Sequence, residues 1–235
     1  PISMVDNIVR DLDEQYLFTV YCSSLHYDKK INNYNKAKLI FLPLNANGWQ
    51  SIFYDIISML ISLYRKADII LILGVSGCVF LPIFKLFFRG LIITNIDGLE
   101  WKRGKWSIFA KKFLHLSEYL AVKNSDIVIG DNMEIVRYVN NKYNKEAQFI
   151  AFGGSIREGI DSEFDGSVIL PETFALNISR IEPENNIEMI LQACVNSKFH
   201  IFIFGRWDAN NYSKYLFNKY SKNEFCNLMP HNNSQ

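Results

Sequence analysis

Residues 68–96, DIILILGVSGCVFLPIFKLFFRGLIITNI, decide the fold of this chain. The apolar run at residues 68–73 predicts a buried strand, the glycines after it predict a turn, and residues 79–88 predict a short helix. A second apolar run, residues 91–96, predicts another buried strand. Two buried strands joined by a helix are typical of a parallel sheet, because parallel neighbours need a crossover connection.

The same stretch is apolar enough to be considered as a membrane span. Pro82, Lys85 and Arg89 argue against a span, because each central charge costs about 2.5–3.5 kcal/mol on insertion scales. Aromatic residues that alternate with these bases also fit a helix lying on a membrane surface; they are Phe80, Phe84, Phe87 and Phe88. The alternative, which we favour, is a core helix that leads into a buried strand.

The alternation of strands and helices continues outward from this stretch. Strands are predicted at residues 17–22, 38–42, 126–129 and 148–151, and helices at residues 2–12, 51–65, 107–123 and 131–143. The third of these helices is predicted to bury one apolar face, made of Trp106, Phe109, Phe113, Leu116 and Leu120. Asp131 is predicted to cap the fourth, with Glu134 completing a capping box. The alternation predicts an α/β fold with a parallel, doubly wound sheet.

A polar stretch interrupts this pattern, and we expect a domain boundary there, between residues 163 and 164. The pattern then restarts, with strands predicted at residues 174–178, 200–204 and 225–228 and helices at residues 183–195 and 210–219. The resulting domains are residues 1–163 and residues 164–235. The second is about half the size of a nucleotide-binding α/β domain, and the chain begins with Pro rather than Met. We therefore expect a chain truncated at both ends.

Composition excludes several classes of function. A net charge of +1 creates no field that attracts nucleic acid, so no nucleic-acid partner is expected. The four cysteines are widely spaced and form no CxxC or Cys/His cluster, which predicts free thiols and no metal site. We find no Ser/His/Asp arrangement, Walker loop or GxGxxG turn, so a nucleophilic hydrolase and a nucleotide-binding reductase lack support.

Residues 97–106, DGLEWKRGKW, follow a predicted strand, and open parallel sheets bind ligands at the carboxyl ends of their strands. Carboxylates suit hydroxyl groups, an aromatic ring suits the face of a sugar, and bases suit phosphates; the candidates are Asp97, Glu100, Trp101, Lys102 and Arg103. The alternative is the capped start of a helix with solvated charges. The chemical mix of this loop favours a binding role.

A second candidate loop is residues 179–186, SRIEPENN. Arg180 lies at a predicted strand end, just before a helix whose first turn is predicted to begin at Pro183. An arginine beside a helix N-terminus suits a diphosphate. The alternative is a surface ion pair between Arg180 and Glu182 or Glu184. Glycines let the backbone approach a ligand at strand ends; the candidates are Gly153, Gly154 and Gly205.

These segments together resemble a family of bacterial glycosyltransferases of capsule and O-antigen assembly, often rhamnosyltransferases. The resemblance is carried by residues 94–106 (TNIDGLEWKRGKW), 109–123 (FAKKFLHLSEYLAVK), 126–131 (DIVIGD), 149–154 (FIAFGG) and 179–186 (SRIEPENN). It implies a GT-B fold, in which two Rossmann-like domains hold the acceptor and a nucleotide-sugar on either side of a cleft. It also implies transfer with retention, and neither metal nor cofactor.

The resemblance gives each candidate residue an expected role. Asp97 and Glu100 are assigned to catalysis, by orienting acceptor hydroxyls; the acceptor-side residues are Trp101, Lys102 and Arg103. The donor would be bound by Arg180, Gly153, Gly154, Asn185 and Gly205. The expected substrates are a nucleotide-sugar such as dTDP-rhamnose and a lipid-linked saccharide, in the cytoplasm at the inner face of the plasma membrane.

This chain departs from the family pattern in three places. Asn185 stands where wider relatives carry a lysine, the first strand with its glycine-rich loop is missing, and the chain ends before a glutamate-rich helix motif. The alternative function is therefore an inactive fragment that at most binds a saccharide or a partner.

Overall fold

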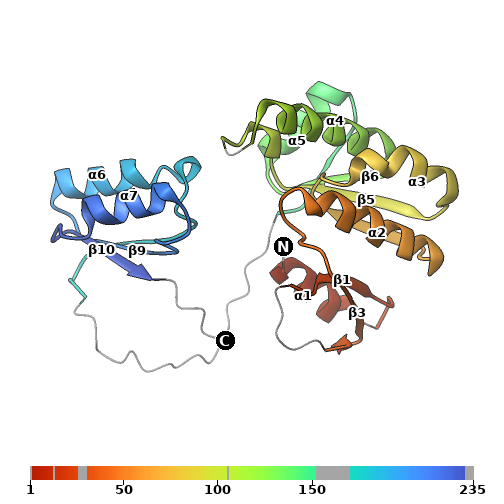
Figure 1. The fold of residues 1–235 in the computed structure, drawn as a ribbon, viewed down its shortest axis with the longest axis horizontal. Helices are drawn as coiled ribbons and strands as arrows, with labels where there is room; N and C mark the ends of the chain where they lie inside the picture. Colours follow the sequence, from red (N-terminus) through yellow and green to blue (C-terminus); the bar gives the residue numbers. More distant parts are fainter. Residues whose placement is uncertain (1, 13, 26–30, 105, 152–169, 231–235) are drawn as a thin grey trace. The chain divides into compact units, whose positions relative to one another are not determined.

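The computed structural model describes residues 2–12, 14–25, 31–104, 106–151 and 170–230. The chain divides into two compact units, Pro1–Ile156 (unit 1) and Arg157–Gln235 (unit 2), and each is described here by itself. The boundary expected between residues 163 and 164 lies outside the described residues. Strands alternate with helices along both units (Figure 1), and the predicted α/β fold with parallel sheets is confirmed.

Unit 1 contains the strands β1 (Thr19–Ser23), β2 (Asn33–Tyr34), β3 (Ala37–Leu42), β4 (Ile69–Leu73), β5 (Leu91–Ile96), β6 (Ile127–Gly130) and β7 (Gln148–Phe149). Its helices are α1 (Ile2–Leu12), α2 (Gln50–Tyr64), α3 (Leu81–Phe87), α4 (Ile108–Asn124) and α5 (Met133–Tyr143), with short 3₁₀ turns η1 (Cys78–Phe80) and η2 (Glu100–Lys102). The residues that decide the fold thus form β4, η1, α3 and β5, as their sequence predicts.

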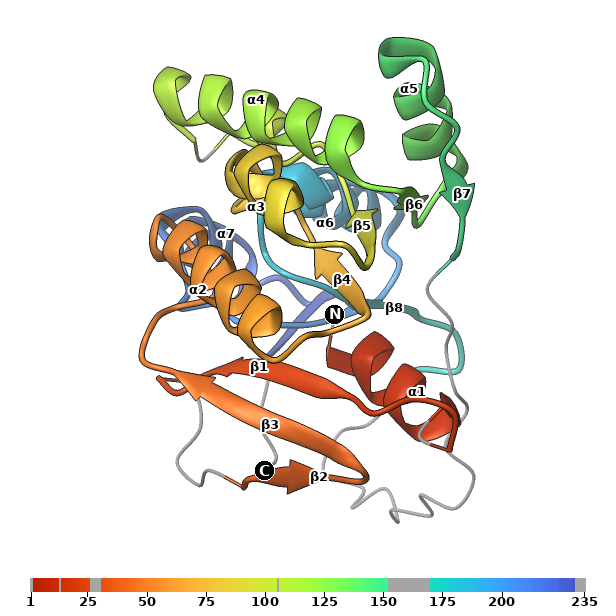
Figure 2. The same cartoon turned by 90° about the vertical axis from the view of Figure 1, so that its right-hand side faces the viewer.

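The strands of unit 1 form two separate sheets (Figure 2). One has the order β1-β3-β2, in which β1 and β3 are parallel and the short β2 is antiparallel to β3. The other has the order β4-β5-β6-β7 and is parallel throughout. Among the described strands, no backbone pairing joins β1 to β4. A side-chain contact links the first sheet to α2, because Tyr21 Oη lies 2.9 Å from Ser62 Oγ.

One face of the sheet β4–β7 carries the core of unit 1. Alternate strand residues point to this face and pack with side chains of α2, α3, α4 and α5; the strand residues are Ile70, Ile72, Ile92, Ile96 and Val128. On the opposite face of β4, Ile69, Leu71 and Leu73 remain exposed. The four helices therefore cover one side of this sheet.

The predicted apolar face of α4 is wrong. Phe109 is 85% exposed and Leu116 is also exposed, whereas the buried stripe consists largely of small or polar residues; it comprises Leu114, Ser117, Glu118, Ala121 and Val122. Small side chains allow close packing against η1 and α3, which the spacing of large apolar residues does not reveal.

Two predicted helix starts are displaced. The cap of α5 is Asn132 rather than Asp131: its side chain accepts from the Ile135 N–H, and its Nδ2 donates to Asp131 Oδ1. In unit 2, Pro183 begins a 3₁₀ turn instead of the long helix, and Asn186 in the left-handed region (φ 53°) separates this turn from the helix that follows.

Unit 2 is a three-stranded parallel sheet of order β10-β9-β8. Its elements are β8 (Ala175–Ile178), η3 (Pro183–Asn185), α6 (Ile187–Ser197), β9 (Ile201–Gly205), α7 (Asn211–Tyr220) and β10 (Cys226–Pro230). Side chains of α6 and α7 pack with the sheet into one apolar cluster. Asn210 and Ser213 form a reciprocal capping box at the start of α7.

The stretch considered as a membrane span folds into separate elements. No helix in the described part of the chain is long and apolar enough to cross a membrane. Phe84 and Phe88 are buried and stacked on each other, with ring centroids 4.9 Å apart. Phe87 points outward from α3 and is 67% exposed. Phe84 and Phe88 are therefore core residues, as the favoured alternative predicts, whereas Phe87 is not.

Candidate functional site

Three loops of unit 1 follow the carboxyl ends of β4, β5 and β6, which are adjacent parallel strands. Loops after neighbouring parallel strands gather at one edge of a sheet, where ligands of open α/β folds bind. We call this edge the carboxyl-edge site. The Gly74 N–H donates to the Asn95 carbonyl at 3.0 Å, so a backbone hydrogen bond joins the loop after β4 to the strand β5.

Glu100 organises the loop after β5 from within. Its carboxylate accepts from Arg103 Nη1 and Trp106 Nε1, each at 3.1 Å. Glu100 therefore stabilises the conformation of the loop, and the predicted role in orienting a substrate would be a second role of the same carboxylate. Trp106 is half-buried and its indole N–H is directed to Glu100.

Trp101 is anchored to a buried carboxylate on α4. Its Nε1 donates to Glu118 Oε2 at 2.9 Å, and Glu118 is 0% exposed. The hydroxyls of Tyr138 and Tyr143 donate to the other oxygen of Glu118 at 2.6 and 2.5 Å. Burial raises the pKa of both tyrosines, and their hydrogen bonds to Glu118 add to the increase, so both phenols stay protonated and donate.

Lys142 completes what we call the Glu118 cluster: Trp101, Glu118, Tyr138, Lys142 and Tyr143. Its Nζ lies 3.9 Å from Glu118 Oε1 and 5.0 Å from the centroid of the Trp101 ring, and it contacts His115 Nε2. Burial lowers the pKa of Lys142, while the charge of Glu118 opposes this decrease. The ring of Trp101 is thus held by the cluster, which fixes the loop on α4 and α5.

Asp97 is the exposed carboxylate of the loop. Partial burial of the carboxylate raises its pKa; a backbone hydrogen bond opposes this increase, and the negative charges of Glu100 and Asp131 add to it. A carboxyl group with a raised pKa can hold or accept a proton closer to neutral pH. Lys102 is exposed, with its Nζ 5.5 Å from the Trp101 ring centroid, whereas Arg103 is paired with Glu100. Of the bases predicted to meet phosphates, Lys102 is thus exposed and Arg103 is half-buried, and Lys105 lies outside the described residues.

The sequence reasoning missed two residues at this edge. Asn95, two residues before Asp97, is buried, and its Oδ1 lacks a hydrogen-bond partner in the part of the chain that the structure describes. Asp55 on α2 accepts a hydrogen bond from the Gly77 N–H at 2.9 Å, and burial raises its pKa to about 7. The available signals were a polar residue that ends an apolar strand and an acid inside an apolar helix.

The predicted donor residues of unit 2 lie around the ends of β8 and β9. Arg180 is exposed, and its Nη1 is 3.6 Å from Glu182 Oε2, as the surface-pair alternative expects. Asn185 Nδ2 donates to the Arg180 carbonyl at 2.7 Å, which fixes the backbone of the turn. Gly205 is packed so closely that an added Cβ would lie 2.6 Å from Ile181 Cδ1. Gly153 and Gly154 lie outside the described residues.

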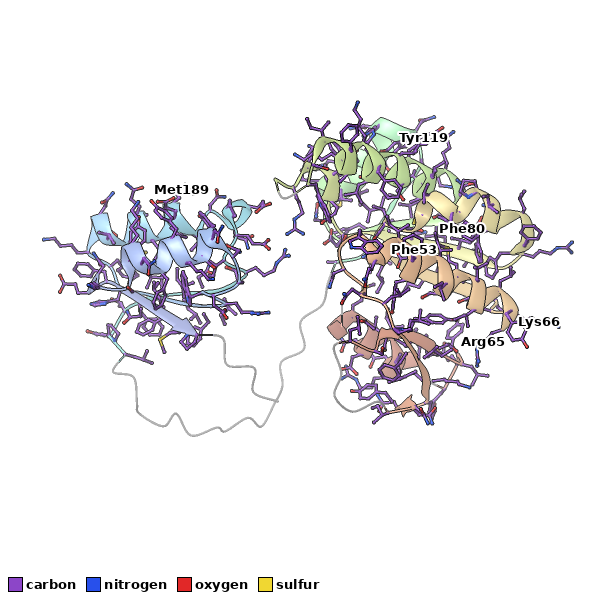
Figure 3. All side chains as sticks on the ribbon, viewed as in Figure 1. Phe53, Arg65, Lys66, Phe80, Tyr119 and Met189 are labelled. Atoms are coloured by element: carbon purple, nitrogen blue, oxygen red, sulfur yellow. The ribbon has the colours of Figure 1, made fainter. Side chains whose placement is uncertain are left out.

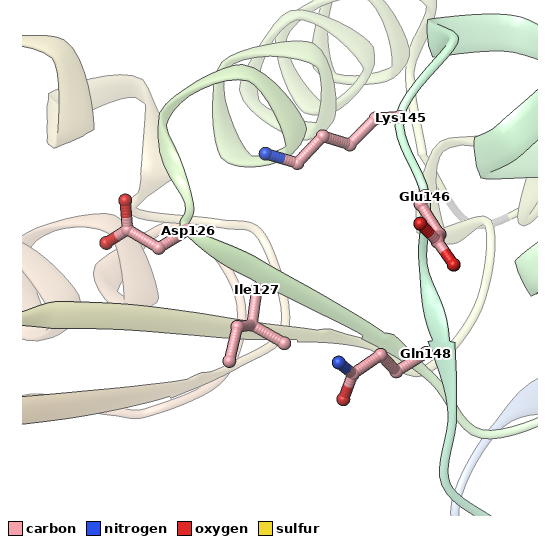
Figure 4. A pocket seen from close by; sticks show the side chains of 5 residues that line it. All are labelled: Asp126, Ile127, Lys145, Glu146 and Gln148. Carbon is pink, nitrogen blue, oxygen red and sulfur yellow. The ribbon is translucent and has the colours of Figure 1, made fainter.

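A hollow in unit 1 lies at the start of β6, whereas the loop 97–106 follows the end of β5 (Figure 4). It is lined by Asp126, Ile127, Lys145, Glu146 and Gln148, near the start of β6 and the chain leading into β7. Asp126 is held by the Ile92 N–H and by Lys85, which lower its pKa. This hollow has no predicted role, and among the described residues no group of three or more His, Cys, Asp or Glu is placed to hold a metal.

Comparison with models of known protein families gives a match. Residues 3–155, well over half of the chain, match a family model described as "Domain of unknown function (DUF1972)". No curated protein matches the chain.

Proposed function

The chain belongs, over residues 3–155, to the DUF1972 domain family, and from this premise we propose that it is a glycosyltransferase that uses a nucleotide-sugar. The DUF1972 domain is found in glycosyltransferase-associated proteins. The observation that carries the proposal is the loop 97–106, which the Glu118 cluster fixes at the carboxyl edge of a parallel sheet. Because this loop is already ordered, it can present carboxylates to hydroxyl groups without a further loss of conformational entropy on binding.

We propose a saccharide acceptor for the carboxyl-edge site. Sugar hydroxyls both donate and accept, so Asp97 can accept from one hydroxyl. The Oδ1 of Asn95 is a buried acceptor that lacks a partner among the described residues. Leaving a buried acceptor without a hydrogen bond costs free energy, and a donor on the ligand would remove that cost. The proposed acceptor is a lipid-linked saccharide, and the product belongs to capsule or O-antigen assembly.

The proposed donor is a nucleotide-sugar such as dTDP-rhamnose, with its diphosphate at Arg180. An exposed ion pair like that of Arg180 and Glu182 contributes about 0–1 kcal/mol, so exchanging Glu182 for a diphosphate costs little. In the transfer, the acceptor oxygen bonds to the anomeric carbon and the bond from that carbon to the diphosphate breaks. The acceptor proton passes to the leaving diphosphate, whose charge Arg180 stabilises. The configuration is retained, and the proposed location is the cytoplasmic face of the membrane.

Donor binding tests this proposal. Titration of the chain with a panel of nucleotide-sugars should give saturable binding, and Arg180→Ala should weaken it roughly 10- to 100-fold, the value of a hydrogen bond to a charged group. Arg137→Ala is a matched control, because Arg137 is 65% exposed, Arg180 is 69% exposed, and each pairs with a nearby glutamate. Absence of saturable binding to every donor would exclude the enzyme proposal, and binding without transfer would favour the inactive fragment.

Peripheral contact with an anionic membrane is our second proposal, favoured by the exposed side of α3. Ile83, Leu86 and Phe87 are exposed there, next to the exposed base Arg89. On α2, Phe53 is also exposed, and Arg65 and Lys66 lie at the far end of that helix (Figure 3). Apolar side chains beside bases suit the interface of an anionic lipid surface.

Vesicle co-sedimentation tests this contact. The chain should sediment with vesicles of phosphatidylcholine and phosphatidylglycerol more than with phosphatidylcholine alone. Phe87→Ser should weaken binding about tenfold or more, because a buried Phe side chain contributes about 1.5–3 kcal/mol. Met189→Ser is the control: Met189 lies on α6 of unit 2 (Figure 3) and is 65% exposed, close to the 67% of Phe87. Equal losses in both variants would contradict a specific membrane face.

A further inference from the structure

Asp55 is the one charged residue of α2, and it faces the turn that follows β4. Its Oδ2 accepts the backbone N–H of Gly77 at 2.9 Å, and its carboxylate also takes a hydrogen bond from the Ser76 side chain. The approach is close: a Cβ added at Gly77 would lie 2.2 Å from the Asp55 Cβ. The carboxylate therefore holds the backbone of the turn directly.

The same turn is held from the opposite direction by α4. The Ser117 hydroxyl donates to the carbonyls of Val75, at 2.5 Å, and Ser76, at 3.3 Å. Just before the turn, Gly74 adopts a φ of 100° and donates its N–H to the Asn95 carbonyl. The turn 75–77 is thus clamped between two helices and joined to the strand that leads to Asp97.

The charge of Asp55 is poorly compensated by its surroundings. Residues 74–77 carry no titratable side chain, and α4 faces the turn through the neutral Ser117. The η1 turn contributes Cys78, a fully buried thiol whose pKa is raised by burial and then by the charge of Asp55, so the thiol stays neutral. No ion pair to Asp55 occurs within the described ranges. The charge is stabilised by one backbone donor, the Gly77 N–H, and one hydroxyl donor, Ser76; both oppose the free-energy cost of burying it.

We propose that Asp55 is a positioning residue of the carboxyl-edge site, and that its gain or loss of a proton loosens or tightens the turn 75–77. The ionised carboxylate accepts stronger hydrogen bonds from Gly77 and Ser76, because a charged acceptor shortens and strengthens such bonds. The protonated carboxyl accepts weakly and must itself donate. Burial raises the pKa of Asp55 to about 7, so both forms are populated near neutral pH. The proposal concerns how the turn 75–77 is held at the carboxyl edge, whatever ligand that edge binds, so it does not depend on the glycosyltransferase proposal.

Nuclear magnetic resonance of the full chain tests the proposal. In the wild type, the Gly77 amide proton should move downfield as pH rises through about 7, the pKa of Asp55. In Asp55→Asn this shift should disappear, although an amide oxygen can still accept from Gly77. In Ser76→Ala, which leaves α2 intact, the midpoint should move to higher pH, because Ser76 stabilises the ionised form. Glu134→Gln, an exposed acid on α5, should leave the Gly77 titration unchanged.

Two results would overturn the proposal. One is a Gly77 amide that does not titrate between pH 5.5 and 8.5, and the other is a titration that persists in Asp55→Asn. If Asp55→Asn does not fold, Ser76→Ala still decides, because an unchanged or lower midpoint would contradict the proposed hold of ionised Asp55 on the turn 75–77. Donor binding plays no part in these readouts, so failure of the glycosyltransferase proposal would leave them interpretable.

Discussion

Replacing Glu118 with alanine should lower the free energy of unfolding by about 3–5 kcal/mol, because three partly buried donors lose their acceptor and each unsatisfied group costs about 1–3 kcal/mol. Glu118 accepts from Trp101, Tyr138 and Tyr143, and all three donors would lose their acceptor. Lys142, whose pKa is already lowered by burial, would lose the charge that opposes this decrease. Urea unfolding followed by circular dichroism and tryptophan fluorescence measures the loss; two of the four tryptophans, Trp101 and Trp106, lie in this loop.

Two further variants sharpen this result. Glu134→Ala removes an acid from the exposed side of α5, where it pairs with Arg137, and should change the free energy of unfolding by no more than about 0.5 kcal/mol. Glu118→Gln keeps one acceptor oxygen and should fall between the wild type and alanine. A loss below about 1 kcal/mol in Glu118→Ala, within the range of an ordinary hydrogen bond, would mean that the cluster does not anchor the loop.

Asp55→Asn should remove a pH dependence of stability that the wild type shows between acid and neutral pH. Burial raises the pKa of Asp55 from 3.8 to about 7. The folded chain therefore binds more protons than the unfolded chain between about pH 4 and pH 7, and stability falls as pH rises through this window. The stabilising contribution of the neutral carboxyl is complete below pH 4 and is lost above about 7.

The expected size follows from this shift. Between pH 5 and pH 8 the wild type should lose about 2–3 kcal/mol relative to Asp55→Asn, since one pKa unit corresponds to 1.36 kcal/mol. Urea unfolding of both proteins at a series of pH values measures the difference, with Glu134→Gln following the wild type. Parallel stability curves for wild type and Asp55→Asn would show that Asp55 does not retain its proton to neutral pH.

The architecture was predictable from the sequence because burial on a parallel sheet leaves a simple pattern. Continuous apolar runs such as residues 91–96 became strands, and the helices between them were found by their spacing. The parallel order of the strands follows from the crossovers. The prediction failed where a helix buries small or polar groups. On α4, Ser117 and Glu118 are buried by hydrogen bonding to distant residues, which periodicity does not encode.

The candidate site was only partly predictable. The loop 97–106 could be located because it follows a strand in a parallel sheet, and because its carboxylates, bases and aromatic rings are close together in the sequence. The roles of Trp101 and Glu100 depend on partners supplied by the fold, Glu118 and the loop's own Trp106, and no spacing rule gives them. Asp55 lies far from that loop in sequence and faces a different turn, so only the folded chain shows its place. The catalytic and donor roles remain predictions.

The separation of β1 from β4 has a consequence for how the chain unfolds. Strands that share no backbone hydrogen bonds need not open together, so cooperativity within unit 1 must come from side-chain packing. In the described residues, the Tyr21 to Ser62 contact is one such connection. The sheet of β1, β2 and β3 can therefore open separately from the sheet of β4 to β7. A single melting temperature would then describe only the transition that the chosen probe follows.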